Sequence, residues 1–142
     1  MSRQNAIEVI ARGVCMMEGR ILLCQGRGSS LTYLPGGHVD FGETARQALV
    51  REVREECGRE SVTGRFLGCC ESCFVQDGER HAEVNLLFEL TVEGVSPQEP
   101  PASAEDWIAF RWWPVDKLAD AHFEPAALIQ HLAAPRGDAF SC

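Results

Sequence analysis

The stretch that most constrains this chain runs from Gly36 to Gly58 and reads GGHVDFGETARQALVREVREECG. Three of its glutamates, Glu52, Glu55 and Glu56, stand at positions i, i+3 and i+4. Because residues three and four apart share one face of an α-helix, these carboxylates would lie close together. The stretch therefore predicts a loop–helix–loop that holds a divalent cation against a phosphate chain.

The same pattern has a simpler interpretation, in which the acids belong to a solvated helix face. Like charges at i,i+4 repel by about a few tenths of a kcal/mol, and flanking arginines could offset that repulsion. A metal site is the alternative, since Mg²⁺ prefers hard oxygen ligands, commonly carboxylates together with waters and substrate phosphates. The spacing of the surrounding residues favours the metal site.

That spacing resembles the signature of the Nudix hydrolases over residues 37–59, the Nudix box. Seven fixed positions match, and the apolar Val53 lies among them: Gly37, Glu43, Arg51, Glu52, Glu55, Glu56 and Gly58. At average residue frequencies, a chance match in a chain of this length has odds on the order of one in a million. The departure is Arg59, where the family usually has an apolar residue.

The resemblance implies an activity and a fold. Members of the family hydrolyse the pyrophosphate bond of a nucleoside diphosphate linked to another moiety, usually with Mg²⁺ or Mn²⁺. The implied substrate is therefore a small phosphorylated nucleotide, such as a nucleoside triphosphate, a nucleotide sugar or ADP-ribose. The implied fold is of the α/β class, an α/β/α sandwich with a mixed central sheet and a loop–helix–loop catalytic motif, formed by residues 1–142 as a single domain.

By position in the motif, the resemblance also implies the metal ligands. Glu52, Glu55 and Glu56 are expected as carboxylate ligands and as the catalytic acids, with the backbone carbonyl of Gly37 as a further ligand. Some members carry an additional glutamate before a tryptophan near the last strand. This chain has Arg111 there, so a fourth carboxylate ligand is absent or moved.

Three further positions of the motif are expected to act structurally. Arg51 and Glu43 would form a pair that bridges the loop to the helix and orients the ligand carboxylates, as partners behind metal ligands commonly do. An ordinary surface ion pair is the alternative for them. Gly58 stands where a left-handed residue would end the helix.

The residue that takes the proton from the attacking water stays open at this stage, because the general base differs between subfamilies. Two motif acids and three acids of a later loop are candidates: Glu55, Glu56, Glu99, Glu105 and Asp106.

Substrate contacts are suggested by four residues, each with a simpler explanation. Arg27, in a glycine-rich loop, is a candidate phosphate ligand or a solvated side chain. His38 and His81 are candidate hydrogen-bond partners of the substrate, although isolated histidines are more often structural. Tyr33 is a candidate for stacking on a base, although aromatic residues on sheet segments usually belong to the core. The other stacking candidates are Phe74, Trp107 and Trp112.

Composition narrows the class of protein. With 45% hydrophobic and 24% charged residues, the chain is typical of a soluble globular protein. Its net charge of −8 argues against a general nucleic-acid binder, which needs lysine and arginine to neutralise phosphates. Seven cysteines cannot all pair internally, and the single C-x₂-C spacing, Cys70 to Cys73, lacks the second pair of a zinc site. Reduced cysteines, no apolar leader and no membrane-spanning run predict a cytoplasmic protein. The resemblance to the Nudix family implies a monomer or a homodimer.

Hydrophobic patterning predicts strands around one long helix, with no helix in the first third of the chain. Bends are expected at Gly64 and Gly68, and a frayed tail from Pro135. The expected elements are a hairpin of strands Ala6–Met17 and Arg20–Cys24, an extended segment Leu31–Leu34, a helix Thr44–Cys57, strands Ser61–Val75, Ala82–Val92 and Trp107–Trp113, and a last helix from Pro125 to His131 or Ala133.

Two other functions compete with catalysis. A nucleotide-binding or sensor module could use the Nudix fold without hydrolysis, although such proteins commonly lose motif acids and this chain keeps them all. A structural protein with a charged helix face would show no thermal shift on adding a divalent metal.

Overall fold

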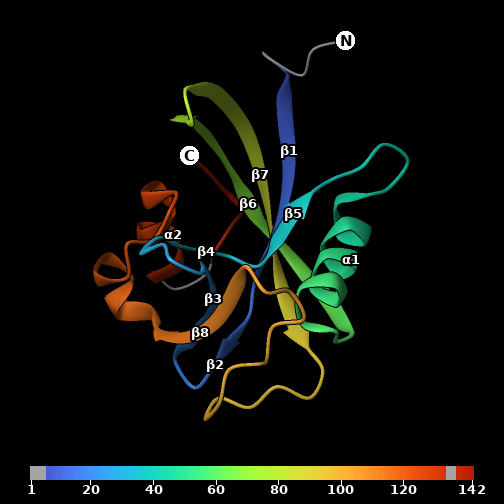
Figure 1. Ribbon diagram of the computed structural model, residues 1–142, viewed down its shortest axis with the longest axis vertical. Coiled ribbons are helices and arrows are strands. Elements are labelled where there is room, and N and C mark those ends of the chain that lie inside the picture. Colours follow the sequence, from blue (N-terminus) through green and yellow to red (C-terminus); the bar gives the residue numbers. More distant parts are fainter. Residues whose placement is uncertain (1–5, 134–136) are drawn as a thin grey trace.

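The computed structural model describes residues 6–133 and 137–142, which form two sheets with helices on either side (Figure 1). The strands are β1 (Ile7–Val14), β2 (Met16–Met17), β3 (Arg20–Gly26), β4 (Thr32–Tyr33), β5 (Gly36–His38), β6 (Ser61–Gln76), β7 (Glu79–Val92), β8 (Ile108–Pro114) and β9 (Phe140–Ser141). The helices are α1 (Ala45–Cys57), the 3₁₀ helices η1 (Val115–Asp120) and η2 (Ala126–Leu128), and α2 (Ile129–Ala133).

The larger sheet is mixed and has the strand order β5-β1-β7-β6-β9. Its central pair, β1 and β7, is parallel, whereas β5 pairs antiparallel with β1 and β6 antiparallel with β7. The smaller sheet is antiparallel, with β2, β4 and β8 all paired to β3. The predicted mixed sheet is therefore confirmed, with a second sheet beside it.

The opening hairpin was predicted only in part. The apolar run from Ala6 to Met17 is not one strand, because the chain changes sheets at the buried Cys15. Only Met16 and Met17 pair with β3, while β1 runs beside β7 in the larger sheet. The parallel pairing covers eight consecutive residue pairs, and these outweigh the short hairpin that the local pattern suggests.

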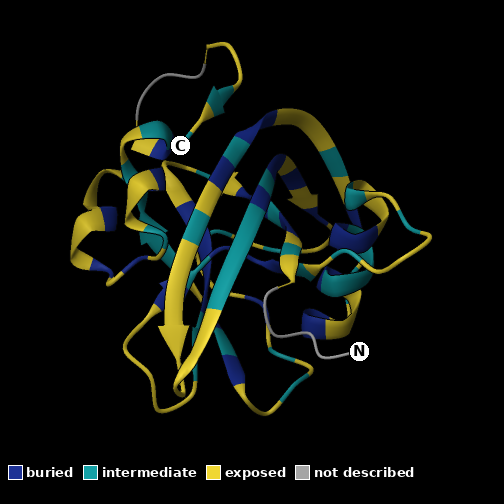
Figure 2. Ribbon diagram, turned by 90° about the horizontal axis from the view of Figure 1, so that it is seen from above, coloured by how far each residue is buried: buried dark blue, intermediate teal, exposed yellow. Residues whose placement is uncertain are grey.

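Two hydrophobic clusters, one on each side of the strands, make the structure a sandwich. Alternate residues of β3 point to opposite faces, so Leu22 and Cys24 join the cluster under α1 while Ile21 and Leu23 join the cluster under η1, η2 and α2. Buried positions lie on the strands and on the inner sides of the helices, and the far ends of β6 and β7 are largely exposed (Figure 2). The predicted α/β/α architecture is confirmed.

Helix α1 begins and ends close to where the sequence predicts. Thr44 accepts a hydrogen bond from the backbone of Gln47, whose side chain bonds back to Thr44, a reciprocal cap that fixes the start. Gly58 adopts a left-handed φ of 68° and donates its N–H to Arg54, which ends the helix as expected. Ala48, Leu49 and Val53 form the buried stripe, and Glu56 is buried with them.

Strand β6 is irregular where Gly64 and Gly68 predict a bend, with register shifts against β7 between Thr63 and Gly68. Gly68 has a φ of 147°, and a side chain there would overlap the backbone of Phe140. Residues 135 and 136 of the predicted frayed tail lie outside the described residues. The prediction is wrong beyond them, because Phe140–Ser141 pairs parallel with β6.

The cysteines agree with the expectation of reduced thiols. All seven are free in the described structure, and Cys15, Cys24, Cys57 and Cys70 are buried. Within the described residues, none of the helices has both the length and the apolar character to cross a membrane.

The glycines at the two ends of the motif allow a direct test of the fold. A Cβ at Gly36, which has a φ of 135°, would overlap the backbone carbonyl of Ala11 in the neighbouring strand. We expect Gly36→Ala to lower the free energy of unfolding by more than about 3 kcal/mol. Gly58 has open space around it, so Gly58→Ala carries only the left-handed strain of about 1–2 kcal/mol. Urea unfolding of both variants measures this, and equal losses would contradict the close approach of β5 to β1.

Candidate metal site

The site forms where β5 passes the middle of α1, and a glycine makes that approach possible. A Cβ on Gly37 would lie 2.5 Å from the carboxyl carbon of Glu52, so any side chain there would displace the carboxylate. The Glu52 carboxylate therefore rests directly against the backbone of β5. Burial raises its pKa, which hydrogen bonding by Arg51 partly opposes.

Glu56, one turn further along α1, is buried. Its side-chain oxygens accept hydrogen bonds from the backbone N–H of Gly36 at 3.3 Å and from the thiol of Cys24 at 3.7 Å. Neither partner is charged. Burial, with repulsion from Glu52 as a second cause, raises the pKa of Glu56 to about 8. The protein thus holds an acid in its core beside a second acid, an arrangement that a cation would stabilise.

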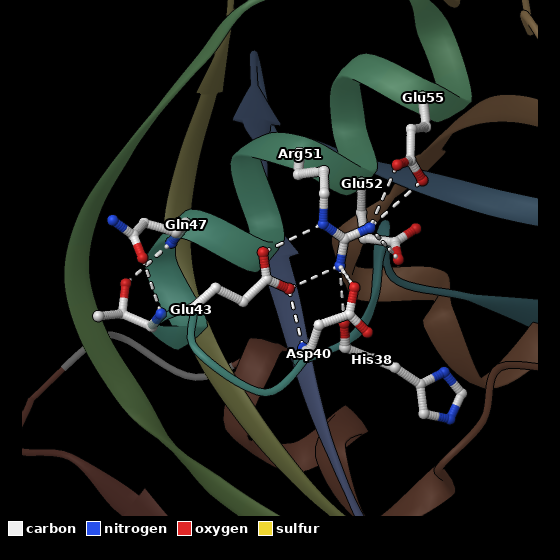
Figure 3. A network of polar contacts seen from close by, with 8 residues as sticks. His38, Asp40, Glu43, Gln47, Arg51, Glu52 and Glu55 are labelled. Atoms are coloured by element: carbon white, nitrogen blue, oxygen red, sulfur yellow. Dashed lines mark hydrogen bonds and ion pairs between the residues drawn. The ribbon is translucent and has the colours of Figure 1, made fainter.

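Arg51 joins the loop before α1 to the helix itself (Figure 3). Its guanidinium donates two hydrogen bonds to Glu43, at 2.7 and 3.1 Å, and one to the backbone carbonyl of His38 at 3.0 Å. It also donates to Glu52 at 3.1 Å and to Glu55 at 3.3 Å. These contacts match the bridge that the sequence predicts, and the role of Arg51 and Glu43 in orienting metal ligands stays a proposal.

The three motif glutamates do not surround one point. Glu55 has a side chain that is 51% exposed and reaches toward Arg51, whereas Glu56 points into the core. Among the residues that the structure describes, no three His, Cys, Asp or Glu side chains form a ready-made metal-binding group. The helix face is therefore shared as predicted, but the carboxylates divide between an inner and an outer position.

The chemistry of the inner position suits a hard divalent cation. Its donors are the carboxylates of Glu52 and Glu56 and the backbone of Gly37, all oxygen atoms of the kind that Mg²⁺ and Mn²⁺ prefer. Burial and the nearby Glu52 raise the pKa of Glu56, so ionising both acids together is costly, and of the two only Glu52 has a hydrogen bond from Arg51. The residues present thus fit a metal ion, and the exposed carboxylate of Glu55 lies further out, against Arg51.

The two histidines expected to contact substrate lie elsewhere. His38 and His81 both contact Glu8, at 2.9 and 3.5 Å, and the His81 ring stacks on Phe74. The imidazole of His38 points away from the Arg51 network (Figure 3). The structure brings these histidines together with each other and not with the motif glutamates, and their contact with substrate remains a prediction.

Tyr33 and Arg27 lie along the strands next to Glu56. Tyr33 pairs with Cys24 across β3 and β4 and is half-buried, and burial raises its pKa to about 12. Arg27 is exposed, and its backbone N–H donates to the carbonyl of Trp107 at 2.8 Å. Their predicted roles in substrate binding also remain untested.

The loop acids differ in their surroundings. The loop 93–107 contacts α1, because the N–H of Ala104 donates to the carbonyl of Glu56 at 2.8 Å. Glu105 follows directly and accepts a hydrogen bond from the indole of Trp107. Glu99 and Asp106 are exposed.

Sequence reasoning missed Cys24, Gly36 and Ala104 as neighbours of the buried carboxylate. Cys24 and Ala104 lie 32 and 48 residues from Glu56 along the chain. No local pattern could have indicated those contacts. Gly36 carried a usable signal, since it stands beside Gly37 at the start of the motif.

Together, the fold and the motif define a mixed α/β protein with a loop–helix–loop carboxylate site. A family model described as the NUDIX domain matches residues 6–132. The chain belongs to the NUDIX domain family.

Individual relatives agree with this assignment. The CTP pyrophosphohydrolase of Escherichia coli is 43% identical over 65 residues, covering 43% of this chain and 47% of the relative. A Mycobacterium tuberculosis protein provisionally named mutator protein MutT4 is 38% identical over 90 residues, covering 62% of this chain and 36% of its own length. The chain thus spans less than half the length of these relatives. A crystal structure of a MutT NUDIX hydrolase from Burkholderia pseudomallei has a TM-score of 0.58 and 26% identity, covering 79% of this chain and 86% of that one.

The Arg51 network gives a test of what holds the motif together. Arg51→Lys keeps the charge but loses the paired hydrogen bonds to Glu43 and cannot also reach the His38 carbonyl. We expect it to lower the free energy of unfolding by about 1–3 kcal/mol. Arg54→Lys is the matched control, because Arg54 pairs with Glu60 on the exposed side of the helix, where such pairs contribute little. Thermal unfolding of both variants measures this, and a larger loss for Arg54→Lys would contradict the bridging role.

Proposed function

We propose that this chain catalyses divalent-metal-dependent hydrolysis of the pyrophosphate bond in a nucleoside diphosphate linked to a further moiety. The observation that supports this most is the pair of carboxylates, Glu52 and buried Glu56, held against the glycine backbone of β5. Family membership supports the reaction class, and the relative named CTP pyrophosphohydrolase supports a small nucleotide as the substrate. The free cysteines support a reducing compartment, and we extend the proposal to the cytoplasm.

In this proposal Glu52, Glu56 and the carbonyl of Gly37 hold Mg²⁺ or Mn²⁺, with Glu55 as an outer ligand. The bound ion would neutralise phosphate charge and lower the pKa of a coordinated water. Arg51 and Glu43 hold β5 and α1 together, so that the Gly37 carbonyl and the Glu52 carboxylate stay close to each other.

One carboxylate must take the proton from the water that attacks phosphorus. Glu55 is 51% exposed, whereas Glu56 is enclosed by Cys24 and Gly36. A base that exchanges protons with solvent after each turnover needs access to water, so we assign this step to Glu55. The water's O–H bond breaks as its oxygen bonds to phosphorus, and the proton moves to a Glu55 oxygen. The bridging P–O bond of the pyrophosphate breaks in the same displacement, and the bridging oxygen leaves with the other phosphate group.

A substrate panel tests the proposed reaction. Purified protein with Mg²⁺ or Mn²⁺ should release products from at least one member of a panel of nucleoside triphosphates, nucleotide sugars, ADP-ribose and dinucleoside polyphosphates. Excess chelator should abolish the activity, and re-adding the metal should restore it. Product identification by mass spectrometry in ¹⁸O-water shows which phosphorus is attacked. Nucleotide binding without any product on prolonged incubation would contradict hydrolysis and favour the sensor module.

The variant Glu56→Gln tests whether Glu56 binds a metal ion or serves only the structure of the core. Glutamine has nearly the same shape and no charge, so the change removes the cost of burying a carboxylate while removing a ligand. We expect the free energy of unfolding to be unchanged or higher and the rate to fall by about 10²-fold or more. The stabilising thermal shift with Mn²⁺ should also be lost.

Glu60→Gln, an exposed acid just beyond the same helix, is the matched control and should keep both the rate and the thermal shift. A Glu56→Gln protein with an unchanged rate would remove the metal assignment.

A further inference from the structure

The loop 93–107, between β7 and β8, is held in place along its whole length. At its start, Arg59 donates to the carbonyl of Glu93 at 3.1 Å. In its middle, the indole of Trp112 donates to the carbonyl of Ser96 at 2.9 Å. Fifteen-residue connections without a helix or strand of their own are uncommon in compact domains and are usually functional.

The end of this loop is fastened to the helix that carries the site. The carbonyl of Glu56 lies in the last turn of α1, where helix carbonyls lack a partner within the helix. The N–H of Ala104 supplies that partner at 2.8 Å. Ser103 closes a turn beside it, since its Oγ accepts from the N–H of Glu105 at 3.1 Å and donates to the Glu105 carbonyl at 2.7 Å. The Ser103 turn therefore rests on the residue whose carboxylate lies in the site.

Trp107 follows the turn and is exposed over 56% of its surface. Its indole N–H donates to the carboxylate of Glu105, and its carbonyl accepts from the N–H of Arg27. The polar edge of the ring is thus fixed, and an exposed aromatic surface remains. The turn lies against the end of α1 that carries Glu56, because the Ser103 hydroxyl also donates to the Glu56 carbonyl at 3.4 Å.

The other aromatic candidates are less suited to a ligand. Trp112 is half-buried and is bonded to Ser96, and Phe74 stacks on His81 away from the glutamates. Tyr33 is packed against the cluster under α1. Phe41 is fully exposed, but it lies on the loop before α1, at the opposite end of the helix from Glu56.

We propose that the exposed ring of Trp107 stacks on the base of the nucleotide substrate, and that Ser103 is the positioning residue that holds it there through the Ala104–Glu56 hydrogen bond. The Cys24 thiol contacts Glu56, and the backbone N–H of Arg27 contacts the carbonyl of Trp107. The three residue steps of chain from Cys24 to Arg27 span about 10 Å. A nucleoside bridges such a gap when its diphosphate lies at the glutamates. This stacking role rests on the function proposed above, the hydrolysis of a nucleoside diphosphate derivative.

Calorimetric titration with non-hydrolysable α,β-methylene nucleoside diphosphates in Mg²⁺ tests it, with methylenediphosphonate as the probe that lacks a base. Trp107→Ala should weaken binding of the base-bearing analogues by about tenfold or more, the usual cost of losing one stacking partner. Binding of methylenediphosphonate should not change. Trp107→Phe should restore the affinity while removing most of the fluorescence quenching that the analogue causes, because Trp112 and Trp113 are only partly exposed.

The positioning role has its own matched pair of variants. Ser103→Ala should weaken the base-bearing analogues several-fold, and Ser103→Thr, which keeps the hydroxyl, should not. Ser96→Ala is the control, because Ser96 forms the same kind of local turn with Gln98 without touching α1. Phe41→Ala, at an exposed aromatic residue on the loop before α1, should leave affinity unchanged.

The outcomes separate the two proposals. A wild-type protein that binds neither kind of probe removes the proposed function and this inference with it. A wild-type protein that binds the analogues with an affinity unaffected by Trp107→Ala, or lowered equally for both probes, leaves the function in place and overturns the stacking role. Equal effects of Ser103→Ala and Ser96→Ala overturn the positioning role.

Discussion

The burial of one carboxylate, that of Glu56, sets the conditions for the rest of the structure. Removing an acid from water without a hydrogen-bonded, charged partner costs free energy, so the neighbouring groups must provide hydrogen bonds to it. The N–H of Gly36 and the thiol of Cys24 do so weakly, at 3.3 and 3.7 Å. The caps at Thr44 and Gly58 fix the two ends of α1, which carries Glu56 on its inner side. A helix free to rotate would turn Glu56 outward, and the site would lose its inner carboxylate.

The motif could be predicted from sequence because everything that defines it is local. The capping pair Thr44 and Gln47, the left-handed Gly58 and the face shared by Glu52 and Glu56 all lie within a few residues of one another. Helix propensity and helical spacing act over that range, and they predicted both ends of the helix to within one residue. The division of the glutamates between an inner and an outer position was not predictable, since it depends on where β5 and Cys24 lie.

The pairing of the strands, in contrast, could not be predicted from local sequence. The apolar segment Ala6–Met17 looks like one strand of a hairpin, yet its first eight strand residues pair with β7, some seventy-five residues later in the chain. The tail strand Phe140–Ser141 pairs with β6 because Gly68 leaves room for its backbone. Alternation along a strand reports which residues are buried and not which strand lies beside them, so long-range pairing was the part that sequence reasoning lost.

The departure of this chain from its family pattern at Arg59 connects the motif to the loop that follows β7. Where an apolar residue would pack the end of the helix, Arg59 extends to the carbonyl of Glu93, over a glycine at position 94 whose Cβ would overlap the guanidinium. The loop is then tied to the motif twice, through Arg59 at its start and through the Glu56 carbonyl near its end. One attachment is to the last turn of α1 and the other is to Arg59, two residues beyond the end of that helix. The exposed ring of Trp107 therefore stands three residues beyond a backbone contact with the helix that carries the carboxylate motif.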